Sequence, residues 1–244
     1  MTIPDIKISL HKAARIAGFM FLFAFIVPTL NWALVLSKFN VANNALATTN
    51  NIMANEFLFR MGLTIELIMS FGLIVLALAL FIILKTVNKS LALFALLLKV
   101  VEATLAAVIV LVSFIALQIL NSEVHPASFA LEHLQFPAGL ILNSHTSLFS
   151  IPMVFLGLDM MIFTYLFLKS KFIPGVLAGF GIISFVLILI HALMFILAPE
   201  YAAMPVNQII FWAPSGLFEI VVGIWLLVKG IDVQQFSNNN LELT

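Results

Sequence analysis

Hydrophobic residues are arranged along the chain in six long, nearly uninterrupted stretches that are separated by more polar connections. Each stretch reaches the roughly 20 residues that a helix needs to cross about 30 Å of hydrocarbon. The stretches lack the alternation of barrel strands, and a lone segment in lipid has to satisfy its own backbone hydrogen bonds. We therefore predict an all-α, polytopic bundle of six transmembrane helices, at residues 14–36, 59–84, 91–117, 147–168, 173–197 and 207–228.

The composition supports an integral membrane protein. Hydrophobic residues make up 63% of the chain and charged residues 9%, and the mean hydropathy is +1.19, far from the balance of soluble domains. The first apolar run is too long for a cleaved signal peptide. Residues 1–244 are therefore expected to form a single integral membrane domain in contact with the lipid bilayer. A formal net charge of zero argues against nucleic acid as a partner, and the absence of cysteine excludes disulfides and thiolate ligands.

The basic residues predict the orientation of the chain. Connections on one side contain eight of them, whereas Lys38 alone lies in a connection on the other side. Lysine and arginine are enriched in cytoplasmic connections. We therefore expect a multi-pass protein of the cell membrane with both termini in the cytoplasm. The eight are Lys7, Lys12, Arg15, Lys85, Lys89, Lys169, Lys171 and Lys229.

The second outer connection, residues 118–146, contains both acidic residues and histidines. Its segment 127–136 has apolar residues at helical spacing, which is consistent with a short amphipathic helix lying on the membrane. The connection also contains His125, His133 and His145, which lack the tight spacing of a metal motif. No cofactor is evident from the sequence, although three histidines on one side leave a metal or haem site open as a hypothesis.

Besides Arg15 at the inner end of the first, the predicted spans contain seven residues with a charged or histidine side chain, where such residues are costly and tend to face the bundle interior, a partner or water. They are the candidate ligand-binding residues: Arg60, Glu66, Lys99, Glu102, Asp159, His191 and Glu219. Two of them are cations and four are carboxylates, which leaves a charge of minus two if all ionise. Because an uncompensated buried carboxylate is unfavourable, we expect some of these acids to be protonated or to hold a cation. Lys99 and Glu102 are three residues apart and share a helix face.

Three functional hypotheses remain open. The first is a protein that binds or transports a small ligand, a cation or a proton through a polar cavity in the membrane. Pro28, Pro152 and Pro214 fall in the outer portions of three spans, and kinks there would open such a cavity, although membrane helices also tolerate proline. The second is an enzyme acting on a lipid or prenyl substrate, with a buried acid as proton donor and His191 as base. The third is a structural protein whose charges only hold helices together.

Familiar catalytic and nucleotide-binding motifs are absent from the sequence: it has no Walker loop, no dinucleotide glycine pattern, no Gly-x-Ser-x-Gly and no His-Glu-x-x-His. Several loose motifs nevertheless occur in a specific order. They are RIAG at 15–18, LFRMG at 58–62, KTVNK at 85–89 with LAL at 91–93, KVVEA at 99–103, KSKFIP at 169–174, and Glu219 followed by WLLVKG at 225–230.

By these motifs the chain resembles a family of bacterial multi-helix membrane proteins known as domain of unknown function 4386. The resemblance covers most of the chain. It implies that Arg60, Glu102 and Glu219 belong to the family pattern, and that Lys99 stands where members often have arginine. Lysine keeps the charge but lacks the planar fork of a guanidinium group. Asp159 has no clear place in the pattern, and the family brings no known activity, cofactor or substrate.

Overall fold

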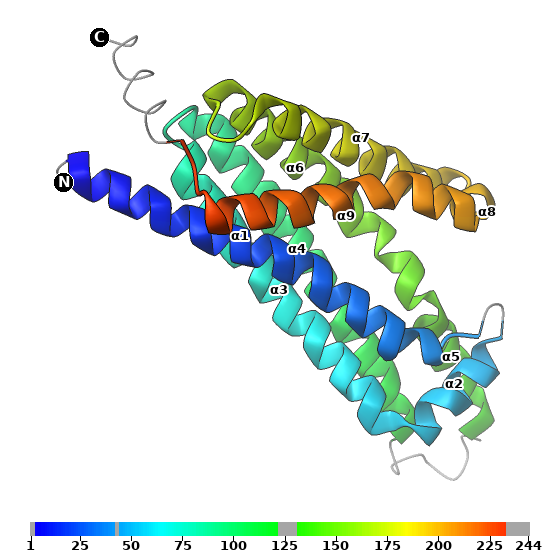
Figure 1. The fold of residues 1–244 in the computed structure, drawn as a ribbon. Coiled ribbons are helices and arrows are strands. Elements are labelled where there is room, and N and C mark those ends of the chain that lie inside the picture. The colour runs from blue at the N-terminus through cyan, green and yellow to red at the C-terminus, as the bar shows by residue number, and fades with distance from the viewer. Residues whose placement is uncertain (1–2, 42–43, 122–130, 233–244) are drawn as a thin grey trace. The chain divides into compact units, whose positions relative to one another are not determined.

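The computed structural model describes residues 3–41, 44–121 and 131–232, with side chains described from residue 9 and, after the second gap, from residue 136. Within these residues all regular structure is helical (Figure 1). The elements are α1 (Ile3–Leu34), η1 (Leu36–Lys38), α2 (Ala45–Ala54), α3 (Glu56–Leu84), α4 (Lys89–Asn121), α5 (Leu131–Leu148), α6 (Ser150–Ser170), α7 (Gly175–Leu197), α8 (Pro199–Ala202) and α9 (Pro205–Val228).

Among the described residues, six segments are long and apolar enough to cross a membrane, which confirms the predicted all-α, six-span class. The first span covers most of α1 together with η1, the fourth covers α6 with most of α5, and the other four are α3, α4, α7 and α9. Large apolar side chains cover their outer surfaces: Phe57 is 77% exposed, Val176 88% and Leu197 82%. Contiguous apolar surface of this kind is rare on soluble monomers, so these helices suit contact with a lipid bilayer.

The helices extend beyond the apolar runs from which they were predicted. The first begins at Ile3 instead of residue 14, and α4 continues to Asn121 instead of residue 117. A helix propagates through polar residues as readily as through apolar ones, because each added residue closes another backbone hydrogen bond. Hydropathy therefore marks the part of a helix that lies in hydrocarbon and misses its ends.

The connection predicted over residues 118–146 is largely helical where it is described. Residues 131–148 form α5, so only part of the expected amphipathic segment 127–136 falls in a described helix and the rest lies outside the described residues. Helix α5 ends at Leu148, four residues before Pro152. A proline ring clashes with the carbonyl group four residues earlier and donates no hydrogen bond to it. Pro152 therefore accounts for the interruption at residue 149 between α5 and α6.

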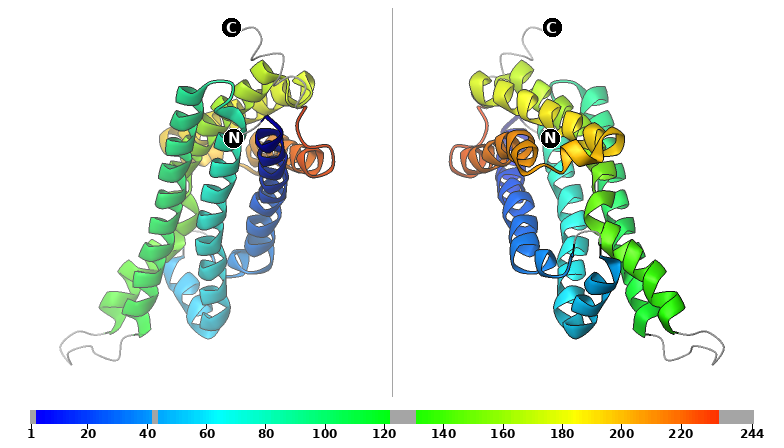
Figure 2. Two further views of the ribbon diagram at one scale, coloured as in Figure 1. Left: turned by 90° about the vertical axis from the view of Figure 1, so that its left-hand side faces the viewer. Right: turned by 90° about the vertical axis from the view of Figure 1, so that its right-hand side faces the viewer.

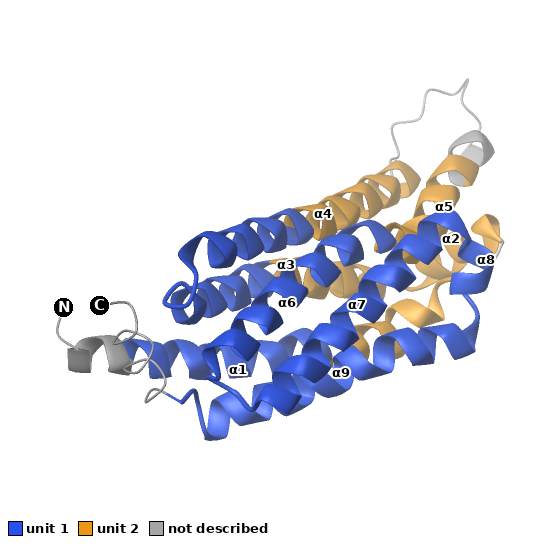
Figure 3. Ribbon diagram, turned by 90° about the horizontal axis from the view of Figure 1, so that it is seen from above, with its two compact units in different colours: residues 1–25, 71–103, 150–244 blue, residues 26–70, 104–149 orange. Residues whose placement is uncertain are grey.

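The described chain divides into two compact units, which are coloured in Figure 3. Unit 1 comprises residues 1–25, 71–103 and 150–244, and unit 2 comprises residues 26–70 and 104–149. Helices α1, α3 and α4 contribute residues to both units. In unit 1, α7 packs against both α6 and α9, as the side views of Figure 2 also show. The core of unit 1 includes Phe218. Its ring makes T-shaped contacts with the rings of Phe21 and Phe185, at centroid distances of 6.1 and 5.6 Å.

Unit 2 is built around the contact between α2 and α5. Asn44 begins α2 by accepting a hydrogen bond from the Ala47 amide at 2.9 Å, the usual role of asparagine at a helix start. A side chain at Gly139 of α5 would approach the Ala45 carbonyl oxygen to 2.8 Å, so glycine is what allows the two helices to meet. The connection between the first two predicted spans thus contains a helix with one buried face.

Glycine also sets the contact between α1 and α9 in unit 1. A Cβ atom at Gly18 would lie 2.8 Å from the Gly223 carbonyl oxygen, and one at Gly223 would lie 3.0 Å from the Gly18 carbonyl oxygen. The obstructing atoms belong to the backbone, which cannot move aside as a side chain does. Small residues permit this close helix packing in membranes.

We predict that Gly18→Ala lowers the free energy of unfolding by about 1–3 kcal/mol, because the added methyl group forces α1 away from α9. The measurement is unfolding in detergent micelles followed by circular dichroism. The matched control is Gly179→Ala on α7, where a Cβ would meet no atom within 4 Å. That variant is expected to gain up to about 1 kcal/mol from helix propensity. Equal stability of the two variants would show that the α1–α9 contact is not close.

Candidate functional site

The most deeply buried charges lie together in unit 1. Lys99 and Glu102 are on α4, and Asp159 is on α6. The Lys99 Nζ atom is 2.7 Å from Glu102 Oε2 and 2.9 Å from Asp159 Oδ1. Lys99 and Asp159 are 0% exposed and Glu102 is 2% exposed. One ammonium group therefore binds two carboxylates, one on its own helix and one on a neighbour.

The local sequence explains how Lys99 reaches both partners. The spacing of three residues places Glu102 on the same face of α4, so the first ion pair forms within the helix. Ala95 and Ala103 are fully buried one turn before and one turn after Lys99. These small residues let α4 approach its neighbours closely enough for the long lysine side chain to contact α6.

Only one oxygen atom of the Asp159 carboxylate lies beside Lys99. The other, Oδ2, makes no well-aligned hydrogen bond within the described residues. The carboxyl group of Asp159 also lies close to that of Glu102. Glu219 on α9 is partly buried and interacts electrostatically with both Lys99 and Glu102. The structure therefore brings four of the seven predicted residues together, and we call Lys99, Glu102, Asp159 and Glu219 the acid cluster.

The acid cluster lies well inside the candidate membrane spans. Asp159 is the tenth residue of the 21-residue helix α6, which places it about 14 Å from the helix start at 1.5 Å per residue. Lys99 lies ten residues into α4, or about 15 Å by the same rise. Water is scarce inside a membrane, so charges buried there depend on one another.

A second polar group, in unit 2, contains Glu66 and His145 together with Ser113, a residue that the sequence analysis did not select. Ser113 Oγ is 2.7 Å from His145 Nδ1, and His145 Nε2 is 3.1 Å from Glu66 Oε1. The three residues come from α4, α5 and α3. An ionised carboxylate only accepts hydrogen bonds, so Nε2 donates to Glu66 and Nδ1 accepts from the Ser113 hydroxyl.

This hydroxyl, imidazole and carboxylate occur in the order found in nucleophilic hydrolases. Ser113, however, is 0% exposed, so its hydroxyl group is not accessible from the surface. The arrangement is therefore best understood as a hydrogen-bonded contact that joins three helices.

His191 is held by hydrogen bonds to its neighbours within unit 1. Trp212 Nε1 donates to His191 Nδ1 at 3.0 Å, so the proton of the neutral ring is on Nε2, which is 3.1 Å from the Ala202 carbonyl oxygen. Both ring nitrogens are thus used within unit 1, and the side chain is 3% exposed. A histidine held in this way is a poor general base, because its only lone pair already accepts a hydrogen bond.

The remaining candidates are placed as follows. Arg60 forms an ion pair with Glu56 one turn earlier on α3, and its guanidinium group lies 5.6 Å from the centre of the Phe114 ring. Both side chains of the ion pair are about one-third exposed. His125 and the side chain of His133 lie outside the described residues. Among the described residues, no group of three histidine or acidic side chains is arranged to hold a metal ion.

We predict that Lys99→Met lowers the free energy of unfolding by about 3–5 kcal/mol, because it leaves buried carboxylates without a partner. Asp159→Asn keeps the Lys99 pair with Glu102 and is expected to cost less than about 1.5 kcal/mol. The measurement is unfolding in detergent micelles, with the exposed Lys169→Met as the matched control. Similar losses for Lys99→Met and Lys169→Met would contradict the buried ion pairs.

The comparisons with known proteins agree with the architecture. The family model described as Domain of unknown function (DUF4386) matches residues 16–230, which include every residue of the acid cluster. No curated protein and no solved structure matches the chain. With the family model covering most of the sequence and six apolar helices in the structure, the chain belongs to the family described as Domain of unknown function (DUF4386).

Proposed function

We propose that this protein binds protons at the acid cluster and transports them across the membrane. The observation that carries the proposal is the sharing of one buried ammonium group by two buried carboxylates, at 2.7 and 2.9 Å. With Lys99, Glu102 and Asp159 all ionised, the three groups have a net charge of minus one. Glu219 adds a second negative charge within electrostatic range. Burying such an excess in hydrocarbon is costly, and binding a positive species relieves it.

A proton fits the geometry better than a metal cation does. Metal ions such as Ca²⁺ take six or more oxygen ligands, and Mg²⁺ requires near-octahedral geometry. Within the described residues the acids do not converge into a three-ligand set. A proton needs a single carboxylate oxygen, and Asp159 Oδ2 offers one without a well-aligned hydrogen bond among the described residues. The carboxyl group of Glu102 lies close enough to share that proton.

The two other hypotheses are less well supported. An intramembrane enzyme was expected to use His191 as its base, but that ring already bonds to Trp212 and Ala202. A purely structural cluster requires only one carboxylate for each lysine. The second and third carboxylates of the acid cluster increase the desolvation cost without adding a cation to pair with. Proton binding would account for the presence of these additional acids.

We expect proteoliposomes that contain the protein and an internal pH-sensitive dye to acidify when a potassium diffusion potential is applied with valinomycin. Glu102→Gln and Glu219→Gln are each expected to reduce the initial rate at least tenfold, because an amide cannot release a proton. Asp159→Asn is expected to act in the same way. Infrared spectroscopy of the same samples should show a carboxylic acid carbonyl band that weakens in the variants.

The control for the proton measurement is Glu200→Gln, an exposed acid on α8 that lies outside the acid cluster. It should acidify vesicles at the rate of the unmodified protein. Equal rates for the unmodified protein, Glu102→Gln and Glu219→Gln would overturn the proposal. Circular dichroism and unfolding of each variant distinguish a loss of transport from a loss of structure.

We infer that both termini face the cytoplasm, since the basic connections lie on their side. The chain contains no cysteine, so single cysteines report accessibility without background. A membrane-impermeant maleimide applied to intact cells is expected to label Ala203→Cys, in the exposed connection before α9, and to spare Ser90→Cys at the start of α4. Labelling of Ser90→Cys alone would reverse the assigned orientation.

A further inference from the structure

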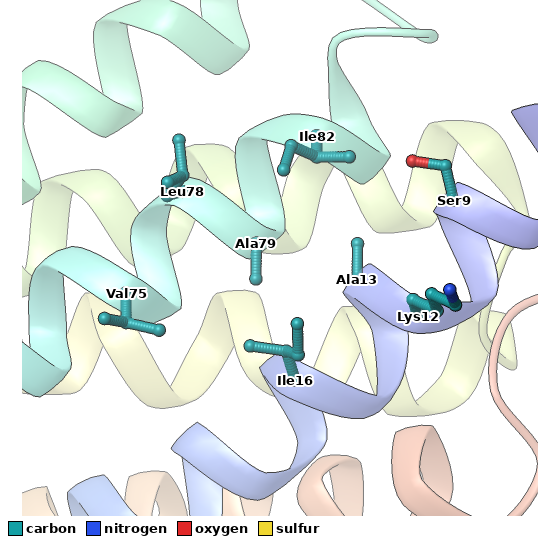
Figure 4. A pocket seen from close by; sticks show the side chains of 8 residues that line it. All are labelled: Ser9, Lys12, Ala13, Ile16, Val75, Leu78, Ala79 and Ile82. Carbon is teal, nitrogen blue, oxygen red and sulfur yellow. The ribbon is translucent and has the colours of Figure 1, made fainter.

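A groove runs between α1 and α3 in unit 1 (Figure 4). Its volume is about 420 Å³, which falls in the range of about 300–1,000 Å³ for ligand sites. The floor contains Ala13 and Ala79, both 4% exposed, and the small side chains leave the space open. The lining residues are Ser9, Lys12, Ala13, Ile16, Val75, Leu78, Ala79 and Ile82.

The groove has apolar walls along most of its length. Ile16, Val75 and Leu78 are 48%, 45% and 50% exposed and form the open sides. From Val75 to Ile82 the helix rises by about 10 Å. That is less than the roughly 15 Å of hydrocarbon in one leaflet, half of the bilayer thickness. Both helices belong to candidate membrane spans, so the medium that fills the groove is the acyl region of a single leaflet.

Polar groups are confined to one end of the groove. Ser9 and Lys12 lie on α1 at the opposite end from Val75, as Figure 4 shows. Lys12 lies within four residues of the start of the first candidate span, Ser9–Lys38, and is therefore at the level of the membrane interface. No acidic residue is among the eight that line the groove. An ammonium group and a hydroxyl group together supply hydrogen-bond donors for an anion.

We propose that the groove binds one acyl chain of an anionic phospholipid, with Lys12 and Ser9 holding the headgroup phosphate. The apolar walls match an acyl chain in polarity, and the length of the groove fits within one leaflet. The charge of Lys12 is opposite to that of the phosphate, and both groups lie at the level of the membrane interface. This site is lined by none of the acid cluster residues, so it does not depend on the proposed proton transport.

A lipid also fits the groove better than another protein helix does. The open part of the groove extends for about two helical turns, whereas a helix that crosses the membrane needs a contact surface along roughly 20 residues. Lys12 at one end would have to be neutralised by a partner helix, while an anionic headgroup supplies the opposite charge at that depth. The occupant is therefore a lipid from the leaflet on the side of Lys12.

Native mass spectrometry of the full chain released from detergent micelles tests the proposal, with phosphatidylglycerol and phosphatidylcholine as probes. The unmodified protein is expected to retain phosphatidylglycerol more strongly. Lys12→Gln should weaken phosphatidylglycerol binding about fivefold, as expected for one basic residue at an anionic membrane surface, and should weaken phosphatidylcholine binding less, because the choline group offsets the phosphate charge of that lipid. Ile16→Trp, which fills the groove from its exposed side, should weaken the binding of both lipids.

Two matched variants serve as controls. Lys169→Gln removes an exposed lysine of α6, and Gly179→Leu adds apolar bulk on α7 at a position with no atom near a new Cβ. Both should bind lipid as the unmodified protein does. Equal phosphatidylglycerol binding by the unmodified protein and Lys12→Gln would overturn the proposal. A change from oligomer to monomer in Ile16→Trp without a change in lipid binding would overturn it too, by assigning the groove to a second copy.

Discussion

The ion pairs of Lys99 with Glu102 and Asp159 constrain the arrangement of α4 and α6 more than any single apolar contact does. Apolar side chains can exchange neighbours at little cost when the surrounding medium is also apolar. A buried ammonium group cannot, because hydrocarbon offers no replacement for a lost carboxylate. The distances of 2.7 and 2.9 Å therefore determine which face of α4 is turned to α6 and at what height the two helices meet.

Other helix contacts show that holding helices together does not require charge. Asn31 donates to the Gly62 carbonyl oxygen at 3.1 Å, and Trp212 donates to His191 at 3.0 Å. Close backbone approach at Gly18 and Gly223 joins α1 to α9. Neutral hydrogen bonds and small residues give such contacts at a lower desolvation cost than buried ions do. The chain thus has less costly means of packing its helices, which supports the additional role proposed for the acid cluster.

The sequence predicts local features well and distant ones poorly. Hydropathy gives the six spans, and the spacing of Lys99 and Glu102 gives their ion pair, because both depend on neighbours along one helix. The pairing of Lys99 with Asp159 depends on how two helices meet, which no spacing reveals. Ser113 is a small hydroxyl residue inside an apolar run, so nothing in the sequence distinguishes it from a packing residue before His145 is placed beside it. The break before Pro152 is visible in the sequence only when α5 is recognised as a helix.

The number of acids in the cluster links its stability to the proposed proton transport. Lys99 with a single carboxylate would form a neutral pair. Adding Asp159 and Glu219 leaves an excess of negative charge, which makes the fully ionised state less favourable. A proton shared within the cluster restores that balance without a change of side chains, and its loss brings back the repulsion between acids. Two states of similar energy that differ by one proton are what a transport cycle requires. The same excess charge that a structural role leaves unexplained is therefore the property that proton binding and release would use.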